Sequence, residues 1–199
     1  MIYARERDRE DVVAKLDAWV ENQEKLDSAN LVFLDESGIN TDFTRLYGRA
    51  KGSERVWDKV PLNTPKSTTL LSSVRLDGEM ICRYFSGAAT GEIFPAYVQQ
   101  VPVPHLKKDD IVIMDNLRIH KVDGVRQAIE QAGASVLYLP PYSPDFNPME
   151  MLWSKLKSVL RSLKIRDIDT LWKAIPLIFD TISLGDIASW FQEAGYSIS

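Results

Sequence analysis

LVFLDES, residues 31–37, is a short apolar run that ends in polar residues, as expected of a strand buried at the centre of a sheet. DIVIMDN at 110–116 repeats this pattern, and SVLYLP at 135–140 supplies a third core strand. TTLLSSVRL at 68–76 and MICRYFSG at 80–87 are separated by an Asp-Gly turn, which is a strong hairpin signal. These five runs are the predicted strands of one sheet.

Helical patterns surround these strands and predict six helices, at 7–25, 91–101, 122–132, from Met149 onward, at 167–180 and at 186–194. The first is amphipathic, with one apolar side formed by Val12, Val13, Leu16, Trp19 and Val20. Gly133 is well placed just past the third helix, and Pro176 is expected to kink or end the fifth. A short strand near Val56 and Trp57 is also considered. The order of elements predicts an α/β fold with a mixed sheet flanked by helices.

The composition is that of a soluble globular protein, with 199 residues, 45% hydrophobic and 26% charged. The single cysteine, Cys82, suits a reducing compartment, and the sequence shows no signal peptide and no membrane span. We therefore expect a cytoplasmic protein. The net charge of -4 is not that of a protein that grips DNA alone. The basic stretches 49–75 and 151–173 are either solvated faces or a nucleic-acid path.

Three carboxylates stand out at the ends of core elements. Asp35 and Asp115 each follow an apolar strand, where a carboxylate is costly unless it is paired, hydrated or bound to a cation, although such an Asp often caps the next turn. Glu36 is expected to point to the opposite face of the strand and either to be structural or to support the site indirectly. Asn147 and Glu150 have the spacing of a capping box, so Glu150 has a structural alternative, and Asp145 is a rival acid in the same loop.

Acids brought together in this way can hold two hard cations about 3.5–4 Å apart, which suits in-line phosphoryl transfer. Other chemistries fit poorly. The sequence has no Gly-rich phosphate loop and no Gly-x-Ser-x-Gly elbow. Two histidines and one cysteine cannot make the usual zinc sites without carboxylates.

LVFLDESG (31–38), VIMDNLRIHK (112–121) and YLPPYSPDFNPMEMLWSKLK (138–157) together resemble the catalytic core of mariner-like transposases of the DDE superfamily, especially their bacterial insertion-sequence branch. The proline-rich loop, Asn-Pro-x-Glu and the basic Trp-containing helix form the most specific of these motifs. Thirty-four residues separate Asp115 from Glu150, as in that group's acidic triad. The resemblance spans about residues 5 to 196 and includes GRAKGSERVW (48–57) and EAGY (193–196).

This resemblance implies a ribonuclease-H-like fold with extra C-terminal helices, and a transposase that binds two Mg²⁺ ions per site, with Mn²⁺ as a substitute. It assigns Asp35, Asp115 and Glu150 as catalytic metal ligands. The implied reaction hydrolyses DNA at transposon ends and transfers the freed 3′-hydroxyl into target DNA, with a homodimer expected on DNA. Asn116, His120 and Asn147 are expected to support the site or position the substrate, and the candidate DNA contacts are Tyr142, Trp153, Lys155, Lys157 and Arg161.

Several of these assignments have plainer alternatives. His120 could serve only at a helix start, Tyr142 and Trp153 could be packing residues, the cations of the helix could be solvated, and His105 is expected to be an exposed loop residue. The predicted organisation is an N-terminal helix and linker at 1–28, a catalytic domain at 29–165 and a helical extension at 166–199.

Only about 30 residues precede Asp35, too few for a helix-turn-helix module. We therefore expect an excised domain, a separately encoded module or a truncated copy; if the source is bacterial, the protein would associate with the nucleoid. The rival functions are another ribonuclease-H-like nuclease, such as an integrase or a junction resolvase, and an inactive remnant that binds DNA or dimerises.

Overall fold

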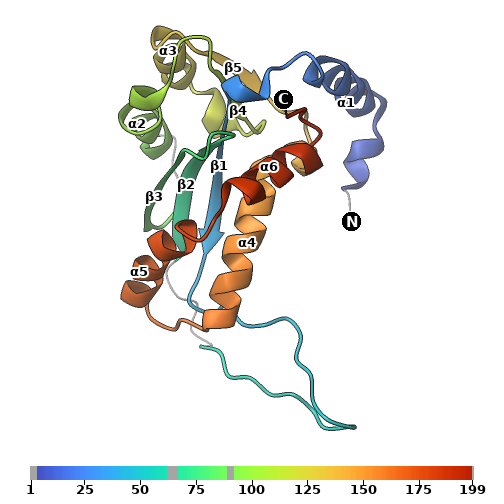
Figure 1. Cartoon of the computed structure of the whole chain (residues 1–199), viewed down its shortest axis with the longest axis vertical. Helices are drawn as coiled ribbons and strands as arrows, with labels where there is room; N and C mark the ends of the chain where they lie inside the picture. Colours follow the sequence, from blue (N-terminus) through green and yellow to red (C-terminus); the bar gives the residue numbers. More distant parts are fainter. Residues whose placement is uncertain (1–3, 62–66, 89–91, 199) are drawn as a thin grey trace.

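A five-stranded mixed sheet forms the centre of the protein, with strand order β3-β2-β1-β4-β5 (Figure 1). The computed structural model describes residues 4–61, 67–88 and 92–198; the ends of the predicted terminal segments, at 1–3 and 199, and Gly91 of a predicted helix lie outside them. The strands are β1 (Leu31–Ile39), β2 (Thr68–Arg75), β3 (Met80–Ser86), β4 (Ile111–Met114) and β5 (Ser135–Tyr138). All five predicted strands are confirmed; β1 extends two residues beyond the predicted run, and the other four end earlier than predicted.

The pairing of β1 creates the place for a site. β1 pairs antiparallel with β2 from Val32 to Ile39, but its parallel pairing with β4 covers only Leu31 to Phe33. β4 ends at Met114, so Asp115 follows it directly, as predicted. The expectation that Asp35 ends its own strand is wrong, because β1 continues to Ile39 against β2. Asp35 instead lies just beyond the point where β4 leaves β1.

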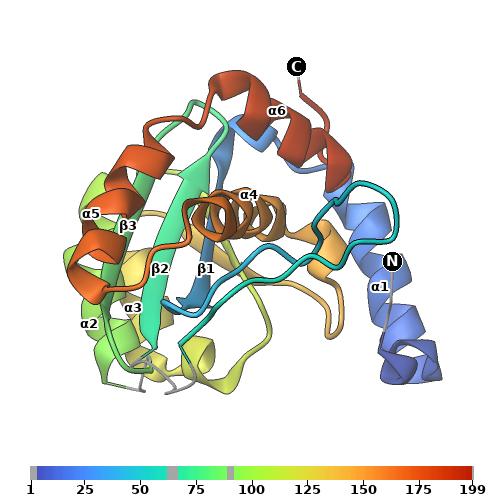
Figure 2. The ribbon, with the colours of Figure 1, turned by 90° about the horizontal axis from the view of Figure 1, so that it is seen from below.

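The alternation of side chains along β1 assigns each residue to one of two cores. Val32 and Leu34 belong to the core between the sheet and the helices α2 (Ile93–Gln100) and α3 (Asp123–Gln131). Leu31 and Phe33 belong to the core on the opposite face of the sheet. That second face is covered by α4 (Pro148–Leu163), α5 (Ile168–Phe179) and α6 (Leu184–Glu193), and Figure 2 shows α4 lying across the strands. By this alternation Asp35 faces α4.

The C-terminal helices contribute to the core of the sheet. Leu171, Ile175 and Phe191 are buried in the same apolar cluster as Phe33. Pro176 does not end α5, which runs three residues past it to Phe179. No single helix among the described residues is long and apolar enough to cross a membrane; α5 and α6, bent by 84° at their break, pass that test of length and composition only as a pair.

The first helix is shorter than predicted. A 3-10 turn, η1 (Arg5–Asp8), precedes α1 (Glu10–Gln23), which buries Val12, Leu16 and Trp19. Val13 and Val20, predicted on the same apolar side, are 40% and 47% exposed. A helix turns 100° per residue, so the stripe through Leu16 and Trp19 leaves those two valines at its margin. The boundaries predicted at residues 28 and 165 remain predictions.

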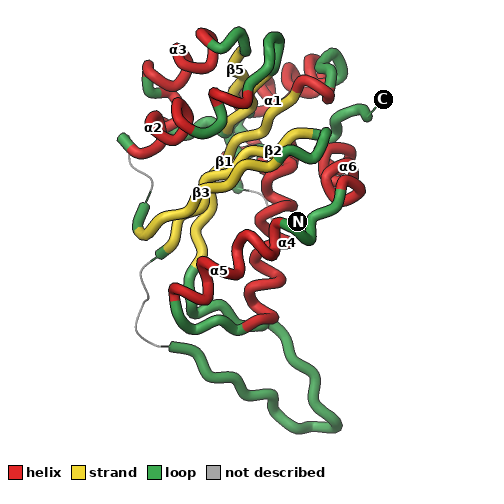
Figure 3. Tube along the Cα trace, turned by 60° about the vertical axis from the view of Figure 1, so that its left-hand side comes forward, coloured by secondary structure: helices red, strands yellow, loops and turns green. Residues whose placement is uncertain are grey.

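Residues 40–61 form a long arm that leaves the end of β1 and projects from the body (Figures 1 and 3). The strand considered near Val56 and Trp57 is wrong, because that stretch has no strand partner. The two limbs of the arm meet at Gly48, where an added Cβ would lie 2.5 Å from Val56. Leu46, Tyr47 and Trp57 are 71%, 90% and 81% exposed.

Candidate active site

Asp35 is a buried carboxylate held by three hydrogen bonds. The backbone N–H of Glu36 donates to Oδ1 (2.7 Å), and the Asn147 amide and the Trp153 indole donate to Oδ2 (2.9 and 3.2 Å). Burial raises its pKa to about 7, and the nearby charges of Asp115 and Glu150 add to that rise. A carboxylate in this position is easily protonated, and a bound cation would favour its charged form.

Asp115 is oriented by the segment that follows β4. Its Oδ1 accepts a hydrogen bond from the Leu117 backbone (3.0 Å) and lies 2.6 Å from Nδ1 of His120. His120 is completely buried and packs on Phe94, with 4.4 Å between ring centroids. Burial alone would lower the pKa of His120, but its contact with Asp115 raises it above the usual value. Asp115 therefore caps its turn and still lines a pocket.

Glu150 lies in the first turn of α4, after Asn147 as N-cap and Pro148 as first helical residue. The Asn147 side chain accepts from the Met149 backbone (3.1 Å), but the Asn147 N–H donates to Pro144 (3.1 Å). The capping box suggested by the sequence therefore does not form, since its donor is already used. Loss of hydration raises the pKa of Glu150, Asp115 adds to this effect, and Lys157 opposes it.

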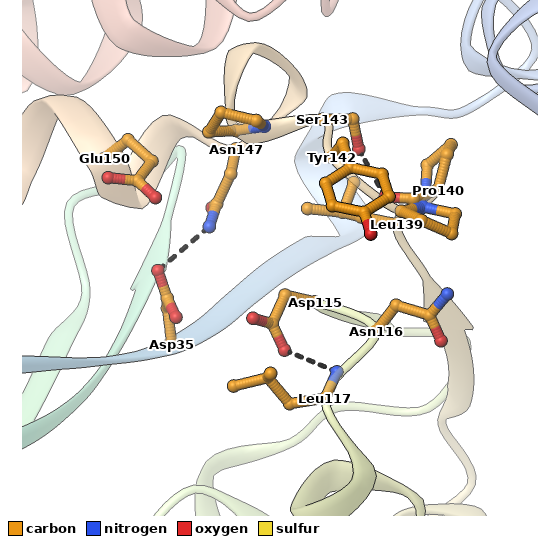
Figure 4. A pocket seen from close by; sticks show the side chains of 12 residues that line it. Asp35, Asp115, Asn116, Leu117, Leu139, Pro140, Tyr142, Ser143, Asn147 and Glu150 are labelled. Atoms are coloured by element: carbon orange, nitrogen blue, oxygen red, sulfur yellow. Dashed lines mark hydrogen bonds between the residues drawn. The ribbon is translucent and has the colours of Figure 1, made fainter. Parts of the chain in front are cut away.

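These three acids line one pocket of about 410 Å³ between the β4 end, the proline-rich loop and the start of α4 (Figure 4). Asn116 and Tyr142 also line it. In the part of the chain that the structure describes, no three His, Cys, Asp or Glu side chains gather closely enough to enclose an ion. The carboxylates therefore surround a pocket that is open to a ligand.

Carboxylate oxygens are the donors that Mg²⁺ and Mn²⁺ prefer. The donor set therefore fits divalent cations in chemistry, and the charge of Asp115 adds to the raised pKa of both Asp35 and Glu150. Asp145, the rival third acid, is a different case. It forms a two-point ion pair with Arg7 (2.7 and 2.8 Å), which lowers its pKa, and it does not line the pocket.

The remaining predicted residues have mixed positions. Trp153 is only 2% exposed and its indole donates to Asp35, which favours the packing alternative over stacking on DNA. Lys155 is paired with Asp186 on α6 (2.7 Å), which makes it a poor phosphate contact. Arg161 stacks over Phe43 of the arm (5.3 Å to the ring centroid).

Outside the pocket, Glu36 is half-buried, burial raises its pKa, and it has the strand parity of the face opposite Asp35, as expected. His105 is 54% exposed, as expected, in a 3-10 turn (Val103–His105) beside Glu79 (2.9 Å). No sequence pattern indicated the role of Arg7. Its guanidinium also donates to the Tyr142 carbonyl (2.9 Å) and connects the N-terminal segment to the loop before Glu150.

A family model for DDE superfamily endonucleases matches residues 30–172, a range that contains all three acids. The chain belongs to this family. The match confirms the family recognised in the sequence motifs, and leaves the bacterial insertion-sequence branch as a prediction. No curated protein matches the chain.

Solved structures of a mariner transposase share the fold of this chain. The Mos1 strand transfer complex matches with a TM-score of 0.76 and 16% identity over 97% of this chain and 59% of that one. The mariner Mos1 paired end complex with Mg gives 0.76 and 15% over 98% and 63%. The catalytic domain of Mos1 mariner transposase gives 0.62 and 16% over 100% and 98%. The chain thus spans about three fifths of the transposases in those complexes, and the predicted ribonuclease-H-like fold is confirmed.

Proposed function

We propose that this chain is the catalytic core of a DNA transposase that hydrolyses phosphodiester bonds at transposon ends and joins the freed ends to target DNA. The observation that carries the proposal is the single pocket lined by Asp35, Asp115 and Glu150, in which burial, with a contribution from the charge of Asp115, raises the pKa of Asp35 and of Glu150. Burial of these carboxylates lowers the stability of the metal-free protein, and bound divalent cations would offset that cost. Transposon-end DNA and metal ions in the Mos1 structures support the same assignment.

Two divalent cations, when bound by these three acids, would neutralise the phosphate and activate the nucleophile. Asn147 and Trp153 hold Asp35 in one orientation, and His120 with the Leu117 backbone holds Asp115. In the first reaction, an oxygen of water forms a bond to phosphorus and the bond to the 3′-oxygen breaks, giving a 3′-hydroxyl and a 5′-phosphate. In the second, that hydroxyl attacks a target phosphodiester and displaces another 3′-oxygen.

The test is nicking of supercoiled plasmid by the purified chain with Mn²⁺ and with EDTA. We expect metal-dependent nicking that Asp115→Asn reduces to background. Asp145→Asn is the matched control, because it makes the same change at the rival acid outside the pocket. Both variants should melt cooperatively. Nicking that survives in Asp115→Asn, or that is lost in Asp145→Asn at an unchanged melting temperature, would overturn the assignment. A wild type that binds DNA without nicking it favours the inactive remnant.

We further propose that two copies assemble on DNA. The exposed Leu46, Tyr47 and Trp57 on the arm form an apolar surface of the kind that usually meets a partner. Sedimentation with DNA should give a mass of two chains, and Tyr47→Ser with Trp57→Ser should shift it to one. A single chain per DNA for the wild type would contradict this.

A further inference from the structure

A second hollow adjoins the active-site pocket on the side of α1. It measures about 450 Å³, and Asn116, Pro140 and Pro141 line both it and the pocket. A third hollow of about 400 Å³ continues along α3 and shares Lys121 and Tyr138 with the second. We call the second and third hollows together the Tyr138 groove. The groove therefore begins at the pocket wall beside Asp115 and leads away over the end of β5.

The Tyr138 groove is basic. Lys15 and Lys121 line its first part, and Arg126 lines its far end together with one acid, Asp123. All three cations have exposed side chains. Arg126 also lies 3.5 Å from Glu130, and Lys15 lies 4.0 Å from Asp11, and such exposed pairs at the edge of contact hold a cation weakly. An anion in the groove would meet three cations and one carboxylate.

Tyr138 gives this groove a fixed geometry. Its hydroxyl donates to the His120 carbonyl (3.0 Å), which holds the ring at the end of β5. Lys121 Nζ and Arg126 Cζ lie over that ring, 5.4 and 5.7 Å from its centroid. Attraction between cations and the ring keeps both side chains near the groove instead of dispersed in water. The same 3-10 turn (Arg118–Lys121) carries His120, which contacts Asp115, so groove and pocket share one rigid connection.

We propose that the Tyr138 groove binds the phosphodiester backbone of the DNA strand that continues from the bond cut in the pocket. The proposal rests on the function proposed above. The cations match phosphates, and they occupy the ring of Tyr138, so base stacking there is not available. Binding in the groove should therefore be independent of sequence. Its place differs from the basic stretches 49–75 and 151–173 that the sequence suggested.

Fluorescence anisotropy of a labelled single-stranded oligonucleotide in EDTA, over a series of KCl concentrations, tests the proposal. Lys121→Gln with Arg126→Gln removes two groove cations. Lys107→Gln with Lys108→Gln is the control, because it removes the same charge at the opposite end of β4. Loss of two phosphate contacts should lower the slope of log K against log [salt] by about 1.4, with no such change in the control.

The outcomes separate this groove from the active site. An equal slope in both double variants would overturn the groove, while metal-dependent nicking lost in Asp115→Asn would leave the proposed function intact. A wild type that neither binds nor nicks DNA would overturn both. Loss of affinity that differs between two unrelated oligonucleotide sequences would contradict backbone binding. Tyr138→Leu should weaken binding as the double variant does, whereas Tyr138→Phe, which keeps the ring, should not; equal binding by both would refute the role of the ring.

Discussion

Replacing Asp35 with Asn should stabilise the metal-free protein at alkaline pH while abolishing the proposed cleavage of DNA. Asp35 has a pKa of about 7 in the folded chain, against about 4 in an unfolded one. The folded state therefore binds an extra proton between these values, and its stability falls as pH rises through that window. Three pKa units correspond to about 4 kcal/mol lost between pH 4 and pH 8.

Asparagine avoids this loss at a smaller cost. Both oxygens of Asp35 accept hydrogen bonds, so an amide at this position leaves one donor unpaired, which costs about 1–3 kcal/mol. The net gain at pH 8 is then about 1–3 kcal/mol. For a chain of this length, each kcal/mol raises the melting temperature by about 2–4 °C.

Thermal melts of wild type and Asp35→Asn in EDTA at pH 5 and pH 8 measure this difference. We expect the variant to melt several degrees higher than wild type at pH 8 and not at pH 5. Asp17→Asn, on the exposed face of α1, is the control for the change in net charge. A variant that melts below wild type at both pH values would refute the reasoning, because burial of charge at Asp35 would then not limit stability.

Three further outcomes are expected, two at Asp35 and one at a buried ion pair elsewhere in the sheet. Mn²⁺ should bind about tenfold more weakly per pH unit below 7, because Asp35 must lose its proton, and calorimetry that finds no such dependence would contradict this. Trp153→Phe removes a hydrogen bond that lowers the pKa of Asp35, so the acidic limb of Mn²⁺ binding should move to higher pH while metal-free DNA affinity stays constant; reduced DNA affinity would restore Trp153 as a DNA contact. Arg75 forms a buried two-point ion pair with Asp110 (2.6 and 2.9 Å) at the far end of the sheet. Arg75→Ala leaves the charge of Asp110 buried with, among the described residues, only the Lys107 N–H as donor and should cost about 3–5 kcal/mol in urea unfolding; a loss below about 1 kcal/mol would show that water reaches Asp110.

Much of the fold follows from local patterns. The Asp-Gly turn predicted the β2–β3 hairpin, and Gly78 there has φ of 95°, which glycine adopts without strain. Gly133, with φ of 84°, ends α3 as predicted. Apolar runs predicted the strands, because a strand buried on both faces needs consecutive apolar side chains, and this pattern is visible within a few neighbouring residues.

Features set by distant residues could not be predicted in this way. The end of β1 depends on its pairing with β2, 29 or more positions away, and Asp35 therefore seemed to end its strand. The aromatic ring of Trp153, beside lysines, resembled a DNA contact, and only the fold shows it turned toward Asp35. Arg7 and Asp145 are 138 residues apart, so no local pattern joins them.

Asn147 has a double task that narrows which side chains can replace it. Its oxygen caps α4, while its nitrogen donates to Asp35. Serine and threonine cap helices well but are too short to span both groups, and aspartate would cap the helix and repel Asp35. Glutamine could donate but is a poor cap. Helix capping alone would allow several residues at position 147, but the added hydrogen bond to Asp35 restricts it to asparagine. The N-cap of α4 therefore also fixes the orientation of a proposed catalytic carboxylate.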